Sequence, residues 1–111
     1  MDGLKPPVRW LKAYWHDDDI SYFVEADEDG WVLRQVELRG SDETPRVATA
    51  LAEWPDAMRD GLAAVQAYEA KYGALAEKPI SDWNDFPGVA IARDEFETVW
   101  RRARAHLDRV R

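Results

Sequence analysis

The alternation of residues 31–39 constrains the fold of this chain more than any other feature of its sequence. The segment reads Trp-Val-Leu-Arg-Gln-Val-Glu-Leu-Arg, which places Val32, Val36 and Leu38 on one side and the polar residues 35, 37 and 39 on the other. Successive side chains of a strand point to opposite faces, so a period of two is typical of a half-buried strand. The segment therefore predicts a β-strand and a fold built around a sheet.

Two more β-rich segments precede this strand. Residues 8–15 and 20–26 are rich in aromatic and β-branched residues, and the polar stretch 16–19 separates them. The second segment runs into Asp27-Glu-Asp-Gly30, a turn sequence whose glycine can adopt a positive φ. Residues 46–52 are interpreted as a fourth strand, with an early helical turn as the alternative because of their alanine content. These segments predict an antiparallel meander of three to four strands.

Pairing residue 15 with 20 and residue 26 with 31 assigns the two faces of this sheet. The face that we expect to form the core carries Leu11, Ala13, Trp15, Ile20, Tyr22, Val24, Trp31 and Leu33. The opposite face, expected to be partly solvated, carries Trp10, Lys12, Tyr14, Ser21, Phe23, Glu25, Arg34 and Val36. A register shift of one residue would exchange the two assignments.

Helical patterns follow the strands. Residues 55–72 place apolar side chains at helical spacing, Gly73 follows as a C-terminal cap, and Gly61 makes Asp60 an alternative N-cap. A second helix is expected from Asp94, with Glu97 completing a capping box, over the apolar stripe of Phe96, Val99, Trp100, Ala103, Leu107 and Val110.

Between these helices, residues 74–92 look irregular, with a short strand near 89–92. Strands first and helices later favour an α+β fold in which the sheet packs against a middle helix and a C-terminal helix. The length of 111 residues predicts that 1–111 form a single domain.

Composition excludes several classes of function. The chain has no cysteine, which excludes disulfides, thiolate metal sites and a cysteine nucleophile. The N-terminus lacks the pattern of a signal peptide, and no apolar stretch approaches membrane-spanning length, so we expect a soluble cytoplasmic protein with no membrane partner. A net charge of −7 disfavours binding to nucleic acid.

Basic residues are concentrated at the C-terminal end. Residues 101–111 hold five of the 15 Lys and Arg, and these could form a phosphate-binding strip. The alternative that we favour is structural, because cations stabilise a helix C-terminus and Glu97 can pair with Arg101 one turn away.

Acidic residues gather in two loops that a meander would place at the same end of the sheet. The loops 16–19 and 40–45 would then bring together a group that attracts a basic partner, namely Asp17, Asp18, Asp19, Asp42 and Glu43. Scattered solubilising charges are the alternative. His16 beside three aspartates suggests a metal, but the spacing matches no complete site and the other histidine, His106, lies in a basic helix. We expect neither a metal nor a cofactor.

No motif in the sequence indicates catalysis. The nucleophile elbow, the H-E-x-x-H helix and the glycine-rich phosphate loops are missing from the sequence. Most carboxylates fall in turns, where water keeps their pKa values ordinary. Glu25 and Glu37 lie within strands, and we expect them to form salt bridges with Lys12 or Arg34.

Two stretches carry a resemblance. Trp15-His-Asp leads to residues 25–37, E-A-D-E-D-G-W-V-L-R-Q-V-E, and residues 91–100 read I-A-R-D-E-F-E-T-V-W. Both are similar to a family of small bacterial domains of unknown function. The resemblance implies three strands and a closing helix, and it transfers no site residues because the family has no established activity. Residues 42–88 are longer and richer in alanine than the corresponding part of the short family members.

The pattern as a whole favours binding over catalysis. The first hypothesis is a small acidic protein-binding module, of which an immunity protein or another inhibitor of a basic partner is one concrete version. The alternative is a small-molecule or substrate-binding domain, with or without weak catalysis, that uses an aromatic sheet face formed by Trp10, Tyr14 and Phe23. The sequence leaves the oligomeric state open.

Overall fold

A computed structural model describes residues 8–83, 86 and 88–111, and it has the α+β architecture that the sequence predicts. Five strands form one antiparallel sheet in the order β4-β3-β2-β1-β5. The strands are β1 (Arg9–Trp15), β2 (Ile20–Ala26), β3 (Val32–Arg39), β4 (Pro45–Ala50) and β5 (Val89–Ala90). The expected fourth strand and the short strand near residue 89 are therefore confirmed.

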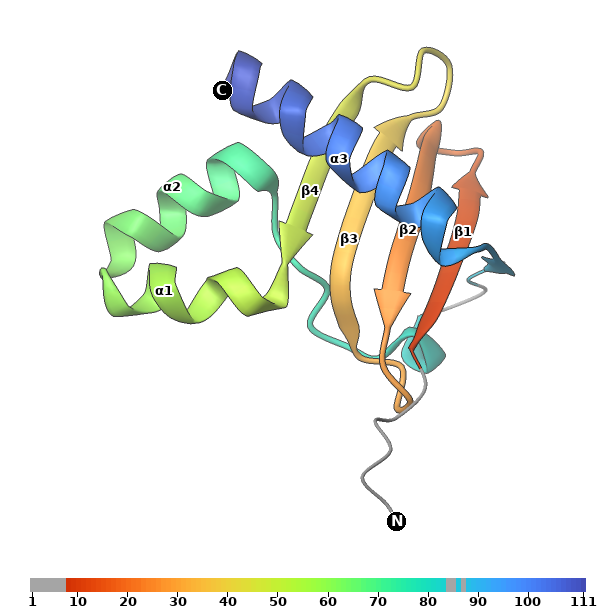
Figure 1. The fold of residues 1–111 in the computed structure, drawn as a ribbon, viewed down its shortest axis with the longest axis horizontal. Helices are drawn as coiled ribbons and strands as arrows, with labels where there is room; N and C mark the ends of the chain where they lie inside the picture. Colours follow the sequence, from red (N-terminus) through yellow and green to blue (C-terminus); the bar gives the residue numbers. More distant parts are fainter. Residues whose placement is uncertain (1–7, 84–85, 87) are drawn as a thin grey trace.

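Helices lie on one face of the sheet and beside one edge (Figure 1). α3 (Arg93–Val110) crosses the face, while α1 (Trp54–Arg59) and α2 (Leu62–Tyr72) form a pair beyond β4. The short 3-10 helices are η1 (Leu51–Glu53) and η2 (Ile80–Asp82). The segment after α2 passes behind the sheet toward η2, so it reaches the face opposite α3.

The middle helix that the sequence predicts is two helices. Gly61, at φ 102°, interrupts the helix between α1 and α2, because a residue with this positive φ cannot continue an α-helix. Gly61 and not Asp60 is the N-cap of α2. At the other end Gly73 adopts φ 90° and donates its N–H to the Glu69 carbonyl at 2.8 Å, which confirms the predicted C-terminal cap.

The sheet register agrees with the sequence at the first hairpin and differs at the second. Trp15 pairs with Ile20 as expected. In the second hairpin Ala26 pairs with Val32 and not with residue 31, because an irregularity between Glu25 and Ala26 shifts the register. Gly30 closes this turn at φ 87°, as the turn sequence predicts.

The assignment of the core to one sheet face was wrong. α3 covers the face that we expected to be partly solvated, and there Phe96, Ala103 and Leu107 pack on strand residues, namely Phe23, Val36, Leu38 and Ala48. The physical reason lies in β3, which turns Val36 and Leu38 toward this face and the polar Gln35 and Glu37 toward the other. The apolar stripe of α3 therefore buries more apolar area against the face that carries Val36 and Leu38 than it would against the face that carries Gln35 and Glu37.

The expected core face carries a second, smaller cluster near one end. Val24, Ala26 and Val32 are buried there under the segment that follows α2, through contacts with Leu75, Ala76, Ile80, Trp83 and Phe86. Toward the other end, Trp15 and Tyr22 stay only partly buried. Trp31, in the turn beside the second cluster, is 46% exposed.

Two arginine networks fasten α3 to the sheet and to the helical pair. Arg34 donates to Glu25 at 2.8 Å and to Glu97 at 2.6 Å, which confirms the expected Glu25–Arg34 salt bridge. Arg104 donates to the Ala48 carbonyl at 2.8 Å and to both carboxylate oxygens of Glu53. The Trp100 ring lies between them, 5.0 Å from the Arg34 guanidinium and 4.5 Å from that of Arg104.

The predicted capping box of α3 does not form. The helix begins at Arg93 after Ala92, no side chain caps it, and Glu97 contacts Arg34 and Arg93 in place of the expected Arg101. One of the C-terminal arginines contacts a different helix: Arg111 donates to the Lys71 carbonyl at 2.9 Å, at the end of α2. Among the described residues, no helix is both long enough and apolar enough to cross a membrane.

Candidate binding groove and acidic end of the sheet

Asp19 joins the two acidic loops into one surface. Its carbonyl accepts the Gly40 N–H at 2.6 Å, and its carboxylate accepts the Ser41 N–H at 3.1 Å. The other carboxylate oxygen accepts the Tyr14 hydroxyl at 2.6 Å. The structure thus places the loops side by side at one end of the sheet, and we call their five acidic residues the acidic end: Asp17, Asp18, Asp19, Asp42 and Glu43.

Negative charge predominates at the acidic end. Asp42 forms an ion pair with Arg39 at 3.6 Å and Glu43 forms one with Arg102 at 3.2 Å, and all four side chains are about half exposed or more. Asp17 and Asp18 are exposed and form no ion pair within residues 8–83, 86 and 88–111. Exposed pairs of this kind are screened by water and salt, so the five carboxylates present a net negative surface.

Local hydrogen bonds favour the ionised form of two of these carboxylates, those of Asp19 and Asp42. The bond from the Tyr14 hydroxyl, followed by that from Ser41, holds the pKa of Asp19 below its usual value. Bonds from Thr44 do the same for the pKa of Asp42. The Tyr14 pKa is raised in turn, since its hydroxyl proton is bonded to Asp19. Asp19 and Asp42 therefore keep their negative charge through the neutral pH range.

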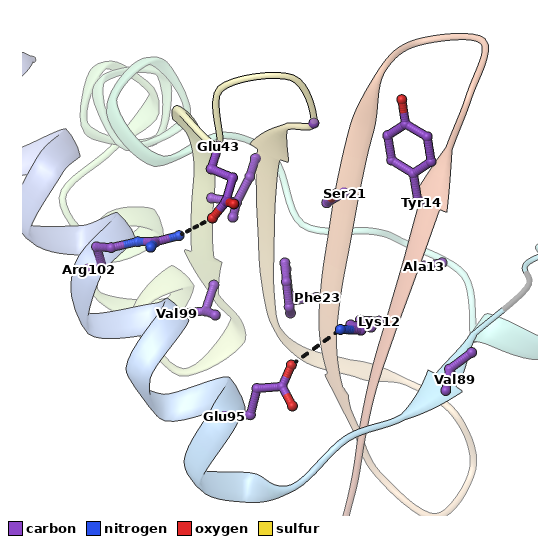
Figure 2. Close-up of a pocket in the computed structure, with 12 residues that line it drawn as sticks. Lys12, Ala13, Tyr14, Ser21, Phe23, Glu43, Val89, Glu95, Val99 and Arg102 are labelled. Atoms are coloured by element: carbon purple, nitrogen blue, oxygen red, sulfur yellow. Dashed lines mark hydrogen bonds and ion pairs between the residues drawn. The ribbon is translucent and has the colours of Figure 1, made fainter.

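A groove of about 620 Å³ adjoins the acidic end on the face that α3 partly covers (Figure 2). Tyr14, Ser21 and Phe23 line it from β1 and β2, and α3 contributes Glu95, Val99 and Arg102. Figure 2 shows Lys12 directed from β1 toward Glu95, and Arg102 directed from α3 toward Glu43.

The groove combines an apolar floor with a charged rim. Phe23 and Val99 lie between the two ion pairs, and Phe23 is 8% exposed. The Lys12–Glu95 pair spans 3.5 Å with both side chains about half exposed, so it contributes roughly 0–1 kcal/mol. Rim pairs this weak can exchange their partners for the charged groups of a bound molecule.

The structure brings part of each predicted set of binding residues together. Tyr14, Phe23 and Glu43 all line the groove, and Asp19 touches it through the Tyr14 hydroxyl. Trp10 does not, because its ring packs against the core and its indole N–H donates to Glu25 at 2.9 Å. The expected open aromatic face is therefore mostly covered by α3.

Sequence reasoning missed the wall that α3 supplies. Glu95, Val99 and Arg102 recur at the i, i+4, i+7 spacing of one helix face, which was visible in the sequence. Nothing in the sequence indicated which part of the sheet this helix face would approach. In the part of the chain that the structure describes, no three His, Cys, Asp or Glu side chains are grouped so as to hold a metal ion.

Comparisons with known proteins found no relative: no protein-family model matches this sequence, and neither a curated protein nor a solved structure matches it. The resemblance to small bacterial domains therefore stays a prediction. Function has to be argued from the geometry and the charge of the surfaces described above.

Proposed function

We propose that this chain is a protein-binding module whose acidic end and adjoining groove receive a basic protein in the cytoplasm. The observation that carries the proposal is the triple attachment of Asp19 to Tyr14, Gly40 and Ser41. It holds five carboxylates at one end of the sheet, next to the mouth of the groove. Clustered charge of one sign raises the association rate of an oppositely charged partner and repels nucleic acid.

The groove supplies what charge alone lacks. Long-range attraction brings a partner close, but affinity needs contacts that exclude water near the centre of the interface. Phe23 and Val99 provide an apolar floor, and the Glu43 and Glu95 carboxylates on the rim can accept Lys or Arg side chains of the partner. An immunity protein that blocks a basic toxin enzyme is a concrete form of this function.

Capture from a lysate of the source cells, followed by mass spectrometry, tests the proposal with two matched variants. The first variant neutralises the exposed part of the acidic end through Asp17→Asn, Asp18→Asn, Asp42→Asn and Glu43→Gln. The second removes the same charge from other exposed positions through Asp60→Asn, Asp82→Asn, Glu69→Gln and Glu77→Gln. Asp19 is left intact in both, because its hydrogen bonds hold the loops together.

We expect a basic protein to bind the wild type and the second variant and to be lost from the first. Stopped-flow mixing with that protein should then show slower association and a flatter salt dependence for the first variant, since steering weakens beyond a Debye length of about 8 Å at physiological ionic strength. Equal losses in both variants would mean that net charge alone governs binding, and the proposed surface would be wrong.

Binding of a small molecule in the same groove is the second candidate. Its volume of about 620 Å³ falls within the usual size of ligand sites. Phe23 offers little exposed aromatic area, however, and Trp10 is engaged with Glu25. A ligand that binds the isolated chain and competes with the captured basic protein would support this candidate.

A further inference from the structure

A second pocket lies on the sheet face opposite α3. It has a volume of about 420 Å³ and is lined by Trp15, Tyr22, Gln35, Glu37, Trp83 and Phe86. Alternation along each strand separates it from the groove: Trp15 and Tyr22 point to one face, whereas their neighbours Tyr14 and Phe23 point to the other. This pocket therefore belongs to a different surface from the one proposed for a protein partner.

Aromatic rings form most of the wall of this pocket. Trp15 and Tyr22 lie edge to face, with ring centroids 6.2 Å apart and planes at 79°. Trp83 and Phe86 form a second such pair at 4.9 Å and 81°. The face of an aromatic ring carries negative potential, and several rings set at steep angles can surround a cation from more than one side. The rings favour an organic cation over an anion.

Glu37 adds a carboxylate to the aromatic wall. Its Oε2 accepts the Gln35 Nε2–H at 2.8 Å, and Gln35 is held in turn because its Oε1 accepts the Ala76 N–H at 3.2 Å. Gln35 is 5% exposed, so it is a buried support that fixes the orientation of Glu37. The hydrogen bonds of the described chain leave the other oxygen, Oε1, without a donor.

The surroundings of Glu37 do not neutralise its charge. None of the described residues that line the pocket is basic, and Glu37 is in no ion pair of the described chain. Burial raises the pKa of Glu37, while Gln35 and the more distant Arg46 lower it. The pKa of Tyr22 is raised by burial and then by the charges of Glu37 and Asp18, so both carboxylates contribute negative potential here. A partly buried carboxylate without a cation is costly to fold and is common at functional sites.

We propose that this pocket binds a small alkylammonium ion that carries one N–H. The rings surround the alkyl groups next to the charged nitrogen, and the N–H of that nitrogen donates a hydrogen bond to Oε1 of Glu37. The volume suits a ligand at the small end of the usual range.

Three probes of nearly the same shape separate charge from hydrogen bonding. N,N-dimethylethanolammonium has the charge and the N–H, N,N,N-trimethylethanolammonium has the charge alone, and 3-methylbutan-1-ol has neither. We expect affinity to fall in that order, with roughly a tenfold difference in Kd between the first and the last, as one desolvated cation contact implies. NMR titration of the indole N–H signals reads the location: those of Trp15 and Trp83 should shift, and those of Trp10 and Trp100 should not.

Glu37→Gln and Glu43→Gln are the matched variants. The first removes the charge of the pocket at nearly constant shape and should reduce the preference for the ammonium probe over the alcohol, because only the rings then attract the charge. The second removes a charge from the opposite face and should leave that preference unchanged. Equal Kd values for the ammonium ion and the alcohol, a preference that Glu37→Gln does not reduce, or no binding with a Kd below about 10 mM would each overturn the proposal.

Discussion

The charged residues beneath α3 and those on the rim of the groove both form arginine–carboxylate ion pairs, but the first are mostly buried and the second mostly exposed. Arg34 is mostly buried, holds two carboxylates at 2.8 Å and 2.6 Å, and lies over the rings of Phe96 and Trp100. Arg102 is mostly exposed and holds one exposed carboxylate at 3.2 Å. Desolvation makes the first set expensive to disrupt, whereas water keeps the second set weak and exchangeable. The buried set therefore contributes to stability, whereas the proposed recognition of a basic partner relies on the exposed set.

Trp100→Ala should give the largest effect, because this ring fills the space between Arg34 and Arg104. Deleting a fully buried aromatic side chain typically lowers the free energy of unfolding by about 3–5 kcal/mol, and for the partly buried Trp100 we expect the lower end of that range. Urea unfolding followed by circular dichroism measures this loss. A loss below about 1 kcal/mol would mean that the ring does not hold the two networks together.

Arg34→Met should cost somewhat less, about 2–3 kcal/mol, because it leaves Glu25 and Glu97 facing each other without their shared cation. Combining it with Glu97→Gln should recover part of the loss, since one of the two uncompensated charges is removed. A double-mutant cycle gives the coupling energy between the two residues. Strictly additive losses would show that Arg34 acts through packing alone.

Acidification should lower the stability that comes from the carboxylates bound to arginine, whose pKa values are lowered in the folded protein. The hydrogen bond from Arg34 lowers the pKa of Glu97, and that from Arg104 lowers the pKa of Glu53. At Glu25 burial raises the pKa, but the hydrogen bonds from Arg34 and Trp10 together outweigh burial and leave the pKa lowered. A carboxylate whose pKa is lowered in the folded state stabilises the protein at pH values above its unfolded pKa of about 4.3. This contribution is lost as the pH falls through the folded-state pKa. Urea titrations between neutral pH and about pH 3 should show this loss, and Arg34→Met should reduce it.

Glu37 should behave in the opposite sense. Its pKa is raised by burial, so its protonated form favours folding and its ionised form opposes folding as the pH rises above the unfolded value. Glu37→Gln should therefore stabilise the protein at pH 7 by up to about 1 kcal/mol and change little near pH 4. Equal effects at both pH values would show that the carboxylate is well solvated.

Glu43→Gln should have the smallest effect on stability, below about 0.5 kcal/mol, because its pair with Arg102 is exposed. The same substitution should still slow association with the basic partner at low salt. A large loss of stability would break the division between the two regions.

Local patterns in the sequence predicted most of the elements, except that Gly61 divides the predicted middle helix into α1 and α2, and tertiary packing decided which sheet face forms the core. The alternation in β3 and the stripe of α3 predicted both elements, but the core face was assigned from the residues that the first two hairpins bring together. Gln35 and Glu37 on that face, and Val36 and Leu38 on the other, argued for the opposite choice. The capping box failed for a similar reason, because Arg34 attracts Glu97 across 63 positions of the chain.

The candidate site was predictable to the same degree. A meander fixes which loops meet, so the acidic end followed from strand order. The groove needs the position of α3 over the sheet, which depends on residues far apart in the sequence. The aromatic pocket depends on Trp83 and Phe86, whose segment has no periodic pattern that would place it against Trp15 and Tyr22.

The attachment of Asp19 also determines how freely the acidic loops can move before any partner arrives. A Cβ atom at Gly40 would lie 2.5 Å from Tyr14 Cε1 and 2.6 Å from Asp19 Oδ1, so any larger residue there must displace these two side chains. Loops held this closely lose their conformational entropy during folding and not during association. Complex formation should then resemble the docking of two rigid bodies, and Gly40→Ala should weaken it by loosening a surface whose charge is unchanged.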